Sequence, residues 1–395
     1  MKVALVTEQF DPRRGGAERS IRELAFALTE AGLDVTVLAR TLASEDVAND
    51  ALSFAVEHLP VHAPSRAGLF RAFSSVLRDY LAHHAHDIVH STVPVAGAHV
   101  FGPRGGSVLH SARRHAQSYP CPIARTVKRA TLGLNRARAA RIRAERDLCL
   151  DPQGPHLAAL STYVADQFRR LYALPDDRIH VIPNGVDTAR LTDPAAIDQA
   201  RILRARFDPD ANTTLLLFAA ENFRLKGLHP LLHAAARVQP PPGRNFRILV
   251  VGTPDYSVYF SLAHRLGLID RVAFLGPTTH VPALLHACDA VVLPTFNDAA
   301  SRLVLEGFAL AKPALTTRFN GAADYLTPAR HGYVLDDPTD LAALANALTQ
   351  LCRPDTLADL GANIERDDLP QHVSIHRHVR QLVALYGKLL ALPTA

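Results

Sequence analysis

Cysteine is scarce in this chain of 395 residues: Cys121, Cys149, Cys288 and Cys352 are widely separated. Such spacing excludes a disulfide scaffold and a zinc site built from cysteines. Long apolar runs are also missing, since no stretch approaches the roughly 18 consecutive apolar residues of a transmembrane helix. The first ten residues, MKVALVTEQF, contain an apolar run too short for a signal peptide. We therefore expect a globular protein of the cytoplasm.

Several motifs of well-known enzyme classes are missing as well. The first apolar run is not followed by GxGxxG, which excludes the dinucleotide fingerprint, and no GxxxxGK[ST] loop is present. GxSxG and HExxH do not occur either. Among the 20 histidines, His83, His84, His86 and His90 stand close together. We interpret them as surface or capping residues, with a metal cluster as the less favoured alternative, and we expect no metal and no cofactor.

Positive charge is concentrated in one part of the sequence. The whole chain carries a formal charge of +5, yet the window from Arg113 to Arg146 holds ten Lys and Arg against one acid, Glu145. That window is at +9 and the remainder is near −4. A block of this kind predicts an anionic surface as its partner.

The basic block predicts a stripe if it forms one helix. On an ideal helix, Arg125, Arg129, Arg136 and Arg143 fall within about 40° of one another, although Gly133 and Asn135 can interrupt it. Such a stripe favours docking to anionic lipid at the inner face of the membrane. A solvated helix face is the alternative, and nucleic acid is disfavoured because aromatic residues are not interleaved. The predicted membrane contacts are Arg125, Lys128, Arg129, Arg136, Arg143 and Arg146.

Short apolar runs alternate with amphipathic segments along the chain. Strands are predicted at 3–7, 34–39, 87–90, 157–161, 213–219, 246–251, 271–275, 290–293 and 314–317. Helices are predicted at 17–31, 69–84, 162–172, 228–238, 257–266, 281–287 and 301–310. This alternation predicts an α/β protein with two doubly wound parallel sheets.

Turn signals cluster at 183–211 and mark the seam between two halves. A last helix, at about 374–390, is long enough to reach back across this seam. Two such halves predict a cleft between them, with ligands at the carboxyl ends of the strands. Two unrelated domains without a shared site are the alternative.

Three segments carry residues suited to an anionic ligand. Gly15 and Gly16 open the first predicted helix, where backbone N–H groups can approach an anion closely. A tight turn would explain them equally well. Arg224 and Lys226 follow the strand at 213–219, and two cations at a strand end suit a diphosphate. An ordinary solvated loop is the alternative.

The third segment, 298–306, contains two carboxylates. Asp298 and Glu306 are eight residues apart and face the same way if a helix begins near Ala299. The small residues at 299–301 leave the first N–H groups of this helix open to a phosphate. A carboxylate two turns into the helix can accept two hydrogen bonds from a diol. The alternative is an N-cap Asp followed by a surface Glu.

Together these segments resemble the retaining GT-B glycosyltransferases of family GT4. The resemblance spans nearly the whole chain and includes GGAE (15–18), STYVADQF (161–168), VIPNGVD (181–187), RLKG (224–227), VVG (250–252), FLG (274–276) and DAASRLVLEGFALAKP (298–313). The last segment matches the E-x7-E motif of the family. Within the family the sequence is most similar to bacterial lipopolysaccharide-core α-glucosyltransferases, through GGAER, FRLKG and LTTRFNGAADY.

The resemblance implies a role for each matching residue. It implies that Glu306 hydrogen-bonds the ribose, that Arg224 and Lys226 neutralise the diphosphate, and that Asp298 binds hydroxyls of the transferred sugar. The further donor-site residues that it implies are Gly15 and Gly16 at the diphosphate, Leu275 and Gly276 at the base, and the amides of Ala299, Ala300 and Ser301. The residues implied for the sugar or acceptor are His110, as a catalytic group, with Glu18, Arg104, Gly105 and Gly106.

Three positions depart from the usual family pattern. Asp298 stands where Glu is usual, and one methylene less can shift the sugar preference. Ala300 and Ser301 replace a common Gly in the sugar-binding loop. Arg224 and Lys226 are two residues apart, whereas many members space them by five, which places the chain in a compact subgroup.

The resemblance implies an N-terminal acceptor domain at 1–190, joined by the helix at about 374–395, and a nucleotide-sugar domain at 191–373. The expected reaction moves a hexose from a UDP-sugar, with UDP-glucose favoured, to a lipid-linked saccharide such as lipopolysaccharide core. Fixed cations would stabilise the leaving group without a metal, and the donor phosphate would take the acceptor proton in a front-face mechanism. The alternatives are a soluble acceptor, a sugar-nucleotide epimerase on the same fold, or a non-catalytic binding protein.

Overall fold

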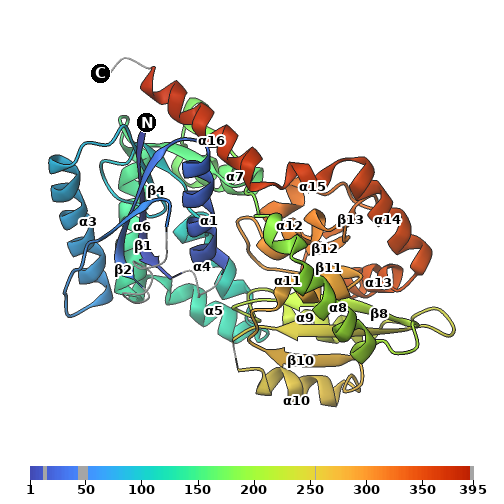
Figure 1. Ribbon diagram of the computed structural model, residues 1–395. Coiled ribbons are helices and arrows are strands. Elements are labelled where there is room, and N and C mark those ends of the chain that lie inside the picture. Colours follow the sequence, from blue (N-terminus) through green and yellow to red (C-terminus); the bar gives the residue numbers. More distant parts are fainter. Residues whose placement is uncertain (12–15, 43–51, 254, 392–395) are drawn as a thin grey trace. The chain divides into compact units, whose positions relative to one another are not determined.

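The computed structural model describes residues 1–11, 16–42, 52–253 and 255–391 of the chain. These residues form two compact units (Figure 1). Unit 1 comprises Met1–Ala116, Thr126–Asn184 and Ile375–Ala395, and unit 2 comprises Gln117–Arg125 and Gly185–Ser374. The chain therefore passes between the units four times, and neither unit is one uninterrupted stretch of sequence.

Unit 1 is built on a parallel sheet with the strand order β3-β2-β1-β4-β5-β6-β7. The strands are β1 (Lys2–Phe10), β2 (Asp34–Leu42), β3 (Ala55–His58), β4 (Ile88–Ser91), β5 (Val100–Phe101), β6 (His156–Ala159) and β7 (Ile179–Val181). The side chains of β1 alternate between two cores. Val3 and Leu5 pack with α1, whereas Ala4 and Val6 pack with α3. The strand is apolar throughout this stretch because both of its faces are covered.

Helices pack on both faces of this sheet. They are α1 (Gly16–Glu30), α3 (Arg66–His83), α4 (Val108–Gln117), α6 (Arg136–Leu150), α7 (Thr162–Tyr172) and α16 (Ile375–Leu390). The C-terminal helix α16 buries Val379, Leu382 and Tyr386 in the same core as α1. The hydroxyl of Tyr386 also lies 2.6 Å from Nδ1 of the buried His90 on β4. The helix expected at about 374–390 is therefore part of unit 1.

The basic block does not form the single helix that its stripe requires. It is divided between α5 (Pro122–Ala130), the 3₁₀ turn η1 (Leu132–Leu134) and α6. Asn135 is the N-cap of α6, since its side chain accepts a hydrogen bond from the backbone N–H of Arg138 at 3.0 Å. The expected angular spacing of the arginines on one ideal helix is therefore wrong.

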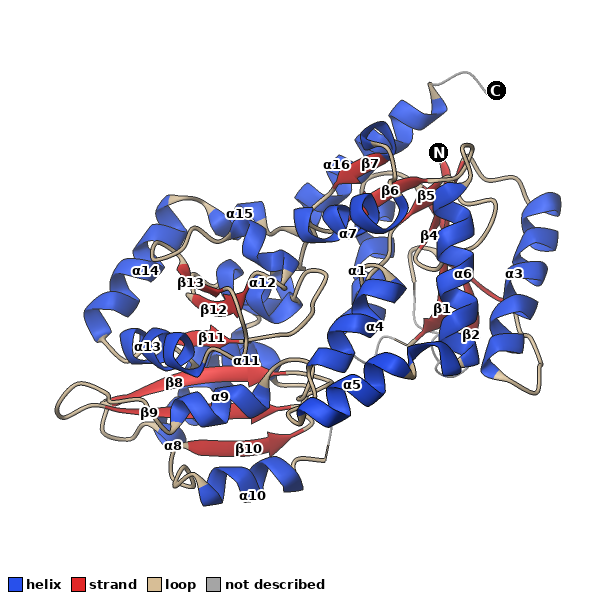
Figure 2. Cartoon of the chain, turned by 180° about the vertical axis from the view of Figure 1, so that it is seen from behind, coloured by secondary structure: helices blue, strands red, loops and turns tan. Residues whose placement is uncertain are grey.

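Unit 2 is built on a second parallel sheet, with the order β10-β9-β8-β11-β12-β13. The strands are β8 (Thr213–Ala219), β9 (Asn245–Val251), β10 (Val272–Gly276), β11 (Ala290–Val292), β12 (Ala314–Thr317) and β13 (Gly332–Leu335), and Figure 2 shows the first three side by side. Its helices are α8 (Pro194–Phe207), α9 (Leu228–Ala235), α10 (Ser257–Arg265), α11 (Val281–Ala287), α12 (Arg302–Ala309), α13 (Leu341–Leu351), α14 (Pro354–Arg366) and α15 (Leu369–His372). Short 3₁₀ turns include η2 (Asp176–Arg178) in unit 1, and η3 (Ala189–Thr192) and η4 (Gly321–Tyr325) in unit 2.

The two sheets confirm the predicted α/β class with doubly wound parallel sheets. In each sheet the first strand lies inside, between the second strand and a later one, so the strand order reverses beside it. Ligands of open parallel sheets bind at the carboxyl ends of strands at such a reversal. The fold therefore points to the carboxyl ends of β1 and β4 in unit 1, and of β8 and β11 in unit 2.

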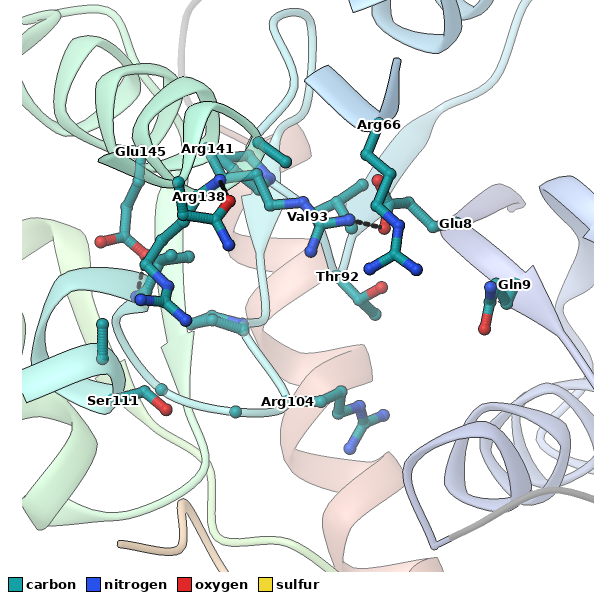
Figure 3. A pocket seen from close by; sticks show the side chains of 18 of the residues that line it. Glu8, Gln9, Arg66, Thr92, Val93, Arg104, Ser111, Arg138, Arg141 and Glu145 are labelled. Atoms are coloured by element: carbon teal, nitrogen blue, oxygen red, sulfur yellow. Dashed lines mark hydrogen bonds and ion pairs between the residues drawn. The ribbon is translucent and has the colours of Figure 1, made fainter. Parts of the chain in front are cut away.

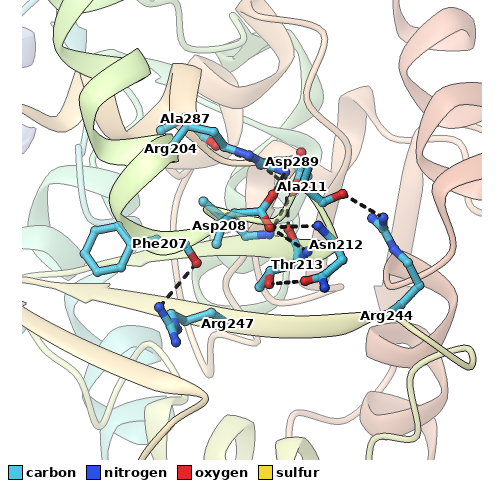
Figure 4. Close-up of polar contacts among 11 residues, drawn as sticks. Arg204, Phe207, Asp208, Ala211, Asn212, Thr213, Arg244, Arg247, Ala287 and Asp289 are labelled. Carbon is cyan, nitrogen blue, oxygen red and sulfur yellow. Dashed lines mark hydrogen bonds and ion pairs between the residues drawn. The ribbon is translucent and has the colours of Figure 1, made fainter.

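A polar cluster fixes α8 to the opposite, amino-terminal edge of the sheet in unit 2 (Figure 4). Arg204 donates to Asp208 and to Asp289, each at 2.8 Å. Asp208 also accepts the backbone N–H of Thr213 at 2.8 Å, and its side chain is 1% exposed. Burial alone would raise the pKa of Asp208, but the hydrogen bonds from Thr213 and the Arg204 guanidinium outweigh it and lower this pKa. The cluster ties the start of β8 to the helix that precedes it.

Candidate functional site

Lys226 and Asp298 meet at the carboxyl ends of β8 and β11. The Nζ atom of Lys226 lies 2.5 Å from Oδ2 of Asp298 and donates to the carbonyl of Asn297 at 3.2 Å. The backbone of Asp298 is fixed as well, because its N–H donates to the carbonyl of Phe319 at 2.8 Å and its own carbonyl accepts from Gly321. The structure thus brings a predicted diphosphate cation and a predicted sugar-binding carboxylate into direct contact.

Gly227 allows the loop after β8 to approach the loop after β11. Its φ is +85°, a left-handed conformation, and a Cβ atom at this position would lie 2.0 Å from the carbonyl oxygen of Pro294. A residue with a side chain would therefore push the two loops apart. This close approach explains why RLKG ends in glycine and how Lys226 reaches Asp298.

Arg224 is held by an aromatic ring of the short 117–125 segment in unit 2. The centre of its guanidinium lies 3.7 Å from the centroid of the Tyr119 ring, and its Nε donates to Oγ of Ser118 at 3.3 Å. Stacking on a ring and the bond to Ser118 hold the guanidinium in a defined orientation. The 117–125 segment was not expected to contribute to this unit.

Glu306 lies within α12 and is 5% exposed. It accepts hydrogen bonds from Arg190 at 2.9 Å and from Arg302 at 3.2 Å, both on Oε1. The alternative of a surface Glu is therefore wrong. The helix begins at Arg302 after the N-cap residue Ser301, not near position 299, so Asp298 precedes the helix and is not its N-cap.

The three small residues that precede α12 are buried. Ala299, Ala300 and Ser301 are 2%, 8% and 4% exposed. The N–H of Ser301 donates to Oδ1 of Asn320 at 3.1 Å, so this amide, which was assigned to a phosphate, already has a protein partner. Oδ1 of Asn320 also accepts the backbone N–H of Ala322, and Nδ2 donates to Oγ1 of Thr316. This one side chain therefore connects Ser301, Thr316 and Ala322.

Leu275 and Gly276, expected at the base, lie at the carboxyl end of β10. Gly276 has φ of +69°, and the pairing with β9 shifts register between Phe274 and Gly276. The ring of Tyr256 stacks on that of Phe274, with centroids 5.3 Å apart. Because β10, β9, β8 and β11 are neighbours in one parallel sheet, Leu275 and Gly276 lie at the same edge of that sheet as the segments that follow β8 and β11.

In unit 1, His110 lies in different surroundings from the loop that contains Arg104, Gly105 and Gly106. His110, on α4, is hydrogen-bonded through Nε2 to the hydroxyl of Tyr163 on α7 at 2.9 Å. Burial, with smaller contributions from neighbouring arginines, lowers the pKa of His110 to about 4, so its ring is neutral at pH 7. Arg104, which donates to Oδ1 of Asn184 at 3.3 Å, lines a cavity together with Gly105 and Gly106. His110 is not among the residues that line it.

That cavity has a volume of about 770 Å³ and lies at the carboxyl ends of β1 and β4 (Figure 3). Its lining includes Glu8 and Gln9, near the carboxyl end of β1, and Thr92 and Val93, which follow β4. Its basic side chains come from several elements and are Arg40, Arg66, Arg104, His115, Arg138 and Arg141. The position of the cavity is the one that the strand order of unit 1 favours for a ligand.

The two carboxylates of the cavity are both engaged by the protein. Glu8 forms an ion pair with Arg141. Glu145, the single acid of the basic block, is buried and accepts from Oγ of Ser107, from the N–H of Val108 and from the hydroxyl of Tyr172. Glu145 thus stabilises the N-terminus of α4, and sequence reasoning missed this role because its partners are distant in the chain.

Two of the predicted residues cannot be placed. Gly15 and the side chain of Glu18 lie outside the described residues. Gly16 is described, opens α1 and is exposed.

The predicted membrane residues divide into two groups. Arg136 and Arg143, with Arg66 and Arg71, line a groove of about 510 Å³ between α3 and α6. Lys128 and Arg129 belong to α5, which also exposes apolar side chains: Ile123 is 75% and Val127 52% exposed. Leu134, in η1, is 78% exposed.

The described residues contain neither a membrane-spanning helix nor a metal-binding cluster. No described helix is both long and apolar enough to span a bilayer. No group of three or more His, Cys, Asp and Glu side chains is placed to bind a metal ion among the residues outside the gaps at 12–15, 43–51, 254 and 392–395.

Two family models match the chain. Residues 14–190 match the model described as Glycosyltransferase Family 4, and residues 200–366 match the model described as Glycosyl transferases group 1. Together the two matches cover nearly the whole chain.

Curated proteins and solved structures agree with these matches. The chain is 28% identical to D-inositol 3-phosphate glycosyltransferase of Pseudarthrobacter chlorophenolicus over 93% of both chains. It is also 28% identical to the lipopolysaccharide glucosyltransferase WaaG of Escherichia coli, over 47% of this chain and 51% of WaaG. Among solved structures, sucrose-phosphate synthase of Thermosynechococcus elongatus aligns with a TM-score of 0.77 at 20% identity, over 99% of both chains. Anabaena HepE, in complex with UDP-glucose, aligns with a TM-score of 0.70 at 17% identity, over 98% of this chain and 100% of HepE.

Proposed function

The chain belongs to the family 4 glycosyltransferases of GT-B fold, and we propose that it moves a hexose from UDP-glucose to a lipid-linked saccharide, with retention of configuration. As a glycosyltransferase it is an enzyme, so the epimerase and the non-catalytic binding protein are set aside. The lipid-linked acceptor of this proposal is of the lipopolysaccharide-core type.

One observation carries the proposal: Arg224, Lys226 and Asp298 lie at the carboxyl ends of β8 and β11, next to α12. The Lys226 ammonium and the stacked Arg224 guanidinium suit the two charges of a departing diphosphate. Asp298, with its backbone fixed on both sides, suits the hydroxyls of a sugar. Glu306, set in place by Arg190 and Arg302, suits the ribose diol.

The proposed mechanism stabilises the leaving group with these fixed cations. As the bond between the anomeric carbon and the diphosphate breaks, negative charge grows on the phosphate oxygens. Lys226 and Arg224 balance that charge without moving, because loop contacts already hold them. The donor phosphate takes the proton of the attacking hydroxyl on the same face of the sugar. The two cations make a metal ion unnecessary for this step.

Two similar proteins support the choice of donor. The structural neighbour HepE is described in complex with UDP-glucose, and WaaG is named a glucosyltransferase. The base would lie against Leu275 and Gly276 at the end of β10.

We further propose that the protein acts on the cytoplasmic face of the inner membrane and docks there through α5. Lys128 and Arg129 would meet anionic headgroups, while Ile123 and Val127 enter the interface. The remaining predicted contacts are Arg125, Arg136, Arg143 and Arg146. Nucleic acid is not part of this proposal.

A soluble acceptor is a second candidate, favoured by one observation. The relative that matches over 93% of this chain is named for a small phosphorylated polyol, D-inositol 3-phosphate.

A panel of sugar nucleotides tests the donor and the reaction. The released nucleoside diphosphate is measured with and without EDTA, with lipid-linked and soluble acceptors, and melting is recorded in parallel. We expect release from UDP-glucose in the presence of EDTA, loss of release in Glu306→Ala, and a rise in melting temperature with UDP. Release that requires added metal would overturn the metal-independent mechanism. The absence of any melting shift with every donor would overturn the donor site.

A further inference from the structure

The cavity of unit 1 contains more positive charge than its own carboxylates balance. Five arginines line it, and its two carboxylates, Glu8 and Glu145, are engaged by Arg141 and by donors around the N-terminus of α4. Polyols and sugars need hydrogen-bonding groups of both kinds, but they do not need an excess of cations. The charge of the cavity therefore points to an anion.

Three of these arginines have guanidinium groups that no carboxylate engages among the described residues. They are Arg40 at the end of β2, Arg66 at the start of α3, and Arg138 in the first turn of α6. The Nε atom of Arg40 is buried and has no hydrogen-bond partner in the described part of the chain. A buried donor without a partner is costly, so a bound acceptor atom would stabilise it.

The cationic surface continues beyond the cavity. The groove of about 510 Å³ between α3 and α6 shares Arg66 and Ala137 with the cavity and adds Arg71, Arg136 and Arg143. The residues that line the groove include no acid. A ligand larger than the cavity could therefore extend along this groove without meeting negative charge.

We propose that the cavity of unit 1 binds an acceptor that carries a phosphate group, and that Arg40, Arg66 and Arg138 bind this group. The inference rests on the proposed glycosyl transfer and adds the chemical class of its acceptor. Arginine matches a phosphate because its N–H groups form a fork that pairs with two oxygens at once. Two sources share this chemistry: a free polyol phosphate and a phosphorylated lipid-linked saccharide.

Matched acceptors test the preference. With UDP-glucose as donor, UDP release is measured with inositol 3-phosphate against inositol, and with a phosphorylated lipid-linked saccharide against the same molecule after phosphatase treatment. We expect the phosphorylated member of one pair to react with a kcat/KM about tenfold higher or more. Arg66→Ala and Arg138→Ala remove this preference by raising KM, and Arg138→Lys, which keeps the charge, restores part of it. Equal reaction of both members of each pair overturns the proposal.

The groove distinguishes the two sources. If the acceptor is the lipid-linked saccharide, Arg71→Ala raises its KM, whereas Arg78→Ala, on the same helix but outside both cavities, leaves it unchanged. If only inositol 3-phosphate reacts and Arg71→Ala changes nothing, the source is the free polyol phosphate. Both results support a phosphate site.

Direct binding separates this inference from the proposed function. Inorganic phosphate is titrated at constant ionic strength into the double variant Arg224→Ala, Lys226→Ala, which lacks the competing cations of unit 2. We expect binding that weakens about tenfold when Arg66→Ala or Arg138→Ala is added, with melting unchanged in the absence of phosphate. Phosphate binding that is insensitive to both changes overturns the site even if transfer occurs. A UDP melting shift without any transfer would count against the proposed function alone.

Discussion

Lys226 and Asp298 form an ion pair, with side chains that are 21% and 17% exposed. A diphosphate that binds at Lys226 would share the ammonium with Asp298, since an ammonium has three donors. In the proposed mechanism, the carboxylate of Asp298 would hold the ammonium in position for the diphosphate. Little reorganisation remains to be done when the leaving-group charge develops, which is the condition for strong electrostatic stabilisation.

Replacement of Lys226 by Ala tests this role. We expect kcat for UDP release to fall about 100-fold or more, because a fixed donor to the developing charge is lost. The melting temperature should change less, since the ion pair is partly exposed and loops surround it. Steady-state kinetics and thermal melting measure the two effects.

The matched control is Lys388→Ala, an exposed lysine on α16 of unit 1. It should leave both kcat and melting unchanged. A Lys226→Ala enzyme with the turnover of the wild type would contradict the diphosphate assignment.

The sequence was sufficient to propose candidate residues for this site, but not to find the residues that contact them. Asp298, Glu306, Arg224 and Lys226 stand in short motifs whose spacing is visible in the chain. The partners of Glu306 are Arg190, which is 116 positions away, and Arg302, one helical turn before it. Arg190 reaches Glu306 only through tertiary folding, so no local sequence pattern predicts this contact.

At the scale of elements, the Arg204 cluster shows how α8 is fixed to the start of β8. We expect Asp208→Asn to destabilise the protein by about 2 kcal/mol at pH 7, because Arg204 loses a buried partner and the amide of Asn accepts less strongly. The folded pKa of Asp208 is lowered, so its contribution is present above the unfolded pKa of about 3.9 and is lost as pH falls below it.

Chemical denaturation of wild type and variant between pH 7 and pH 3 measures this difference. The difference in the free energy of unfolding between wild type and Asp208→Asn should be constant down to about pH 5 and should become smaller toward pH 3. Asp198→Asn is the control, since Asp198 lies on the same helix but is 73% exposed and pairs with Arg201 at the surface. A gap that widens with acid would contradict the lowered pKa.

Strands with buried apolar runs were predictable from the sequence, whereas a short and exposed strand was not. The expected strands at 213–219 and 314–317 coincide with β8 and β12, because their apolar runs are buried on both faces. The strand β3 was not predicted: it has four residues, three of them exposed, and its position is set by pairing with β2. Asn135 is the N-cap of α6, so the helix begins anew after α5. The periodic spacing of the arginines suggested one continuous helix instead.

At the scale of the whole molecule, the proposed membrane contact can be measured by sedimentation with vesicles. We expect the protein to bind vesicles that contain anionic lipid and to dissociate as salt is raised. Lys128→Glu with Arg129→Glu should weaken this binding about tenfold or more, since each basic residue near an anionic surface contributes about 1 kcal/mol.

One control and one further variant accompany this measurement. Arg78→Glu changes an exposed arginine on α3, outside α5, and should bind as the wild type does. Ile123→Ser with Val127→Ser should weaken binding even at low salt, because it removes the apolar contribution. Equal binding to neutral and anionic vesicles would contradict the electrostatic docking.

The overall class was predictable from the alternation of strands and helices, but the exact membership of each unit was not. The transfer of 117–125 to unit 2 depends on contacts such as Tyr119 with Arg224, which join residues more than 100 positions apart. The place of α16 in unit 1 follows from the helical spacing of Val379, Leu382 and Tyr386, once a core is available to receive them.

The membership of α16 has a consequence for biosynthesis. The ribosome releases β1, β4 and their covering helices early, yet the core of unit 1 lacks Val379, Leu382 and Tyr386 until the whole of unit 2 has been translated. Until then His90 has no Tyr386 hydroxyl to bond. Unit 1 therefore cannot complete its core until a helix encoded nearly 300 codons after β4 has been synthesised.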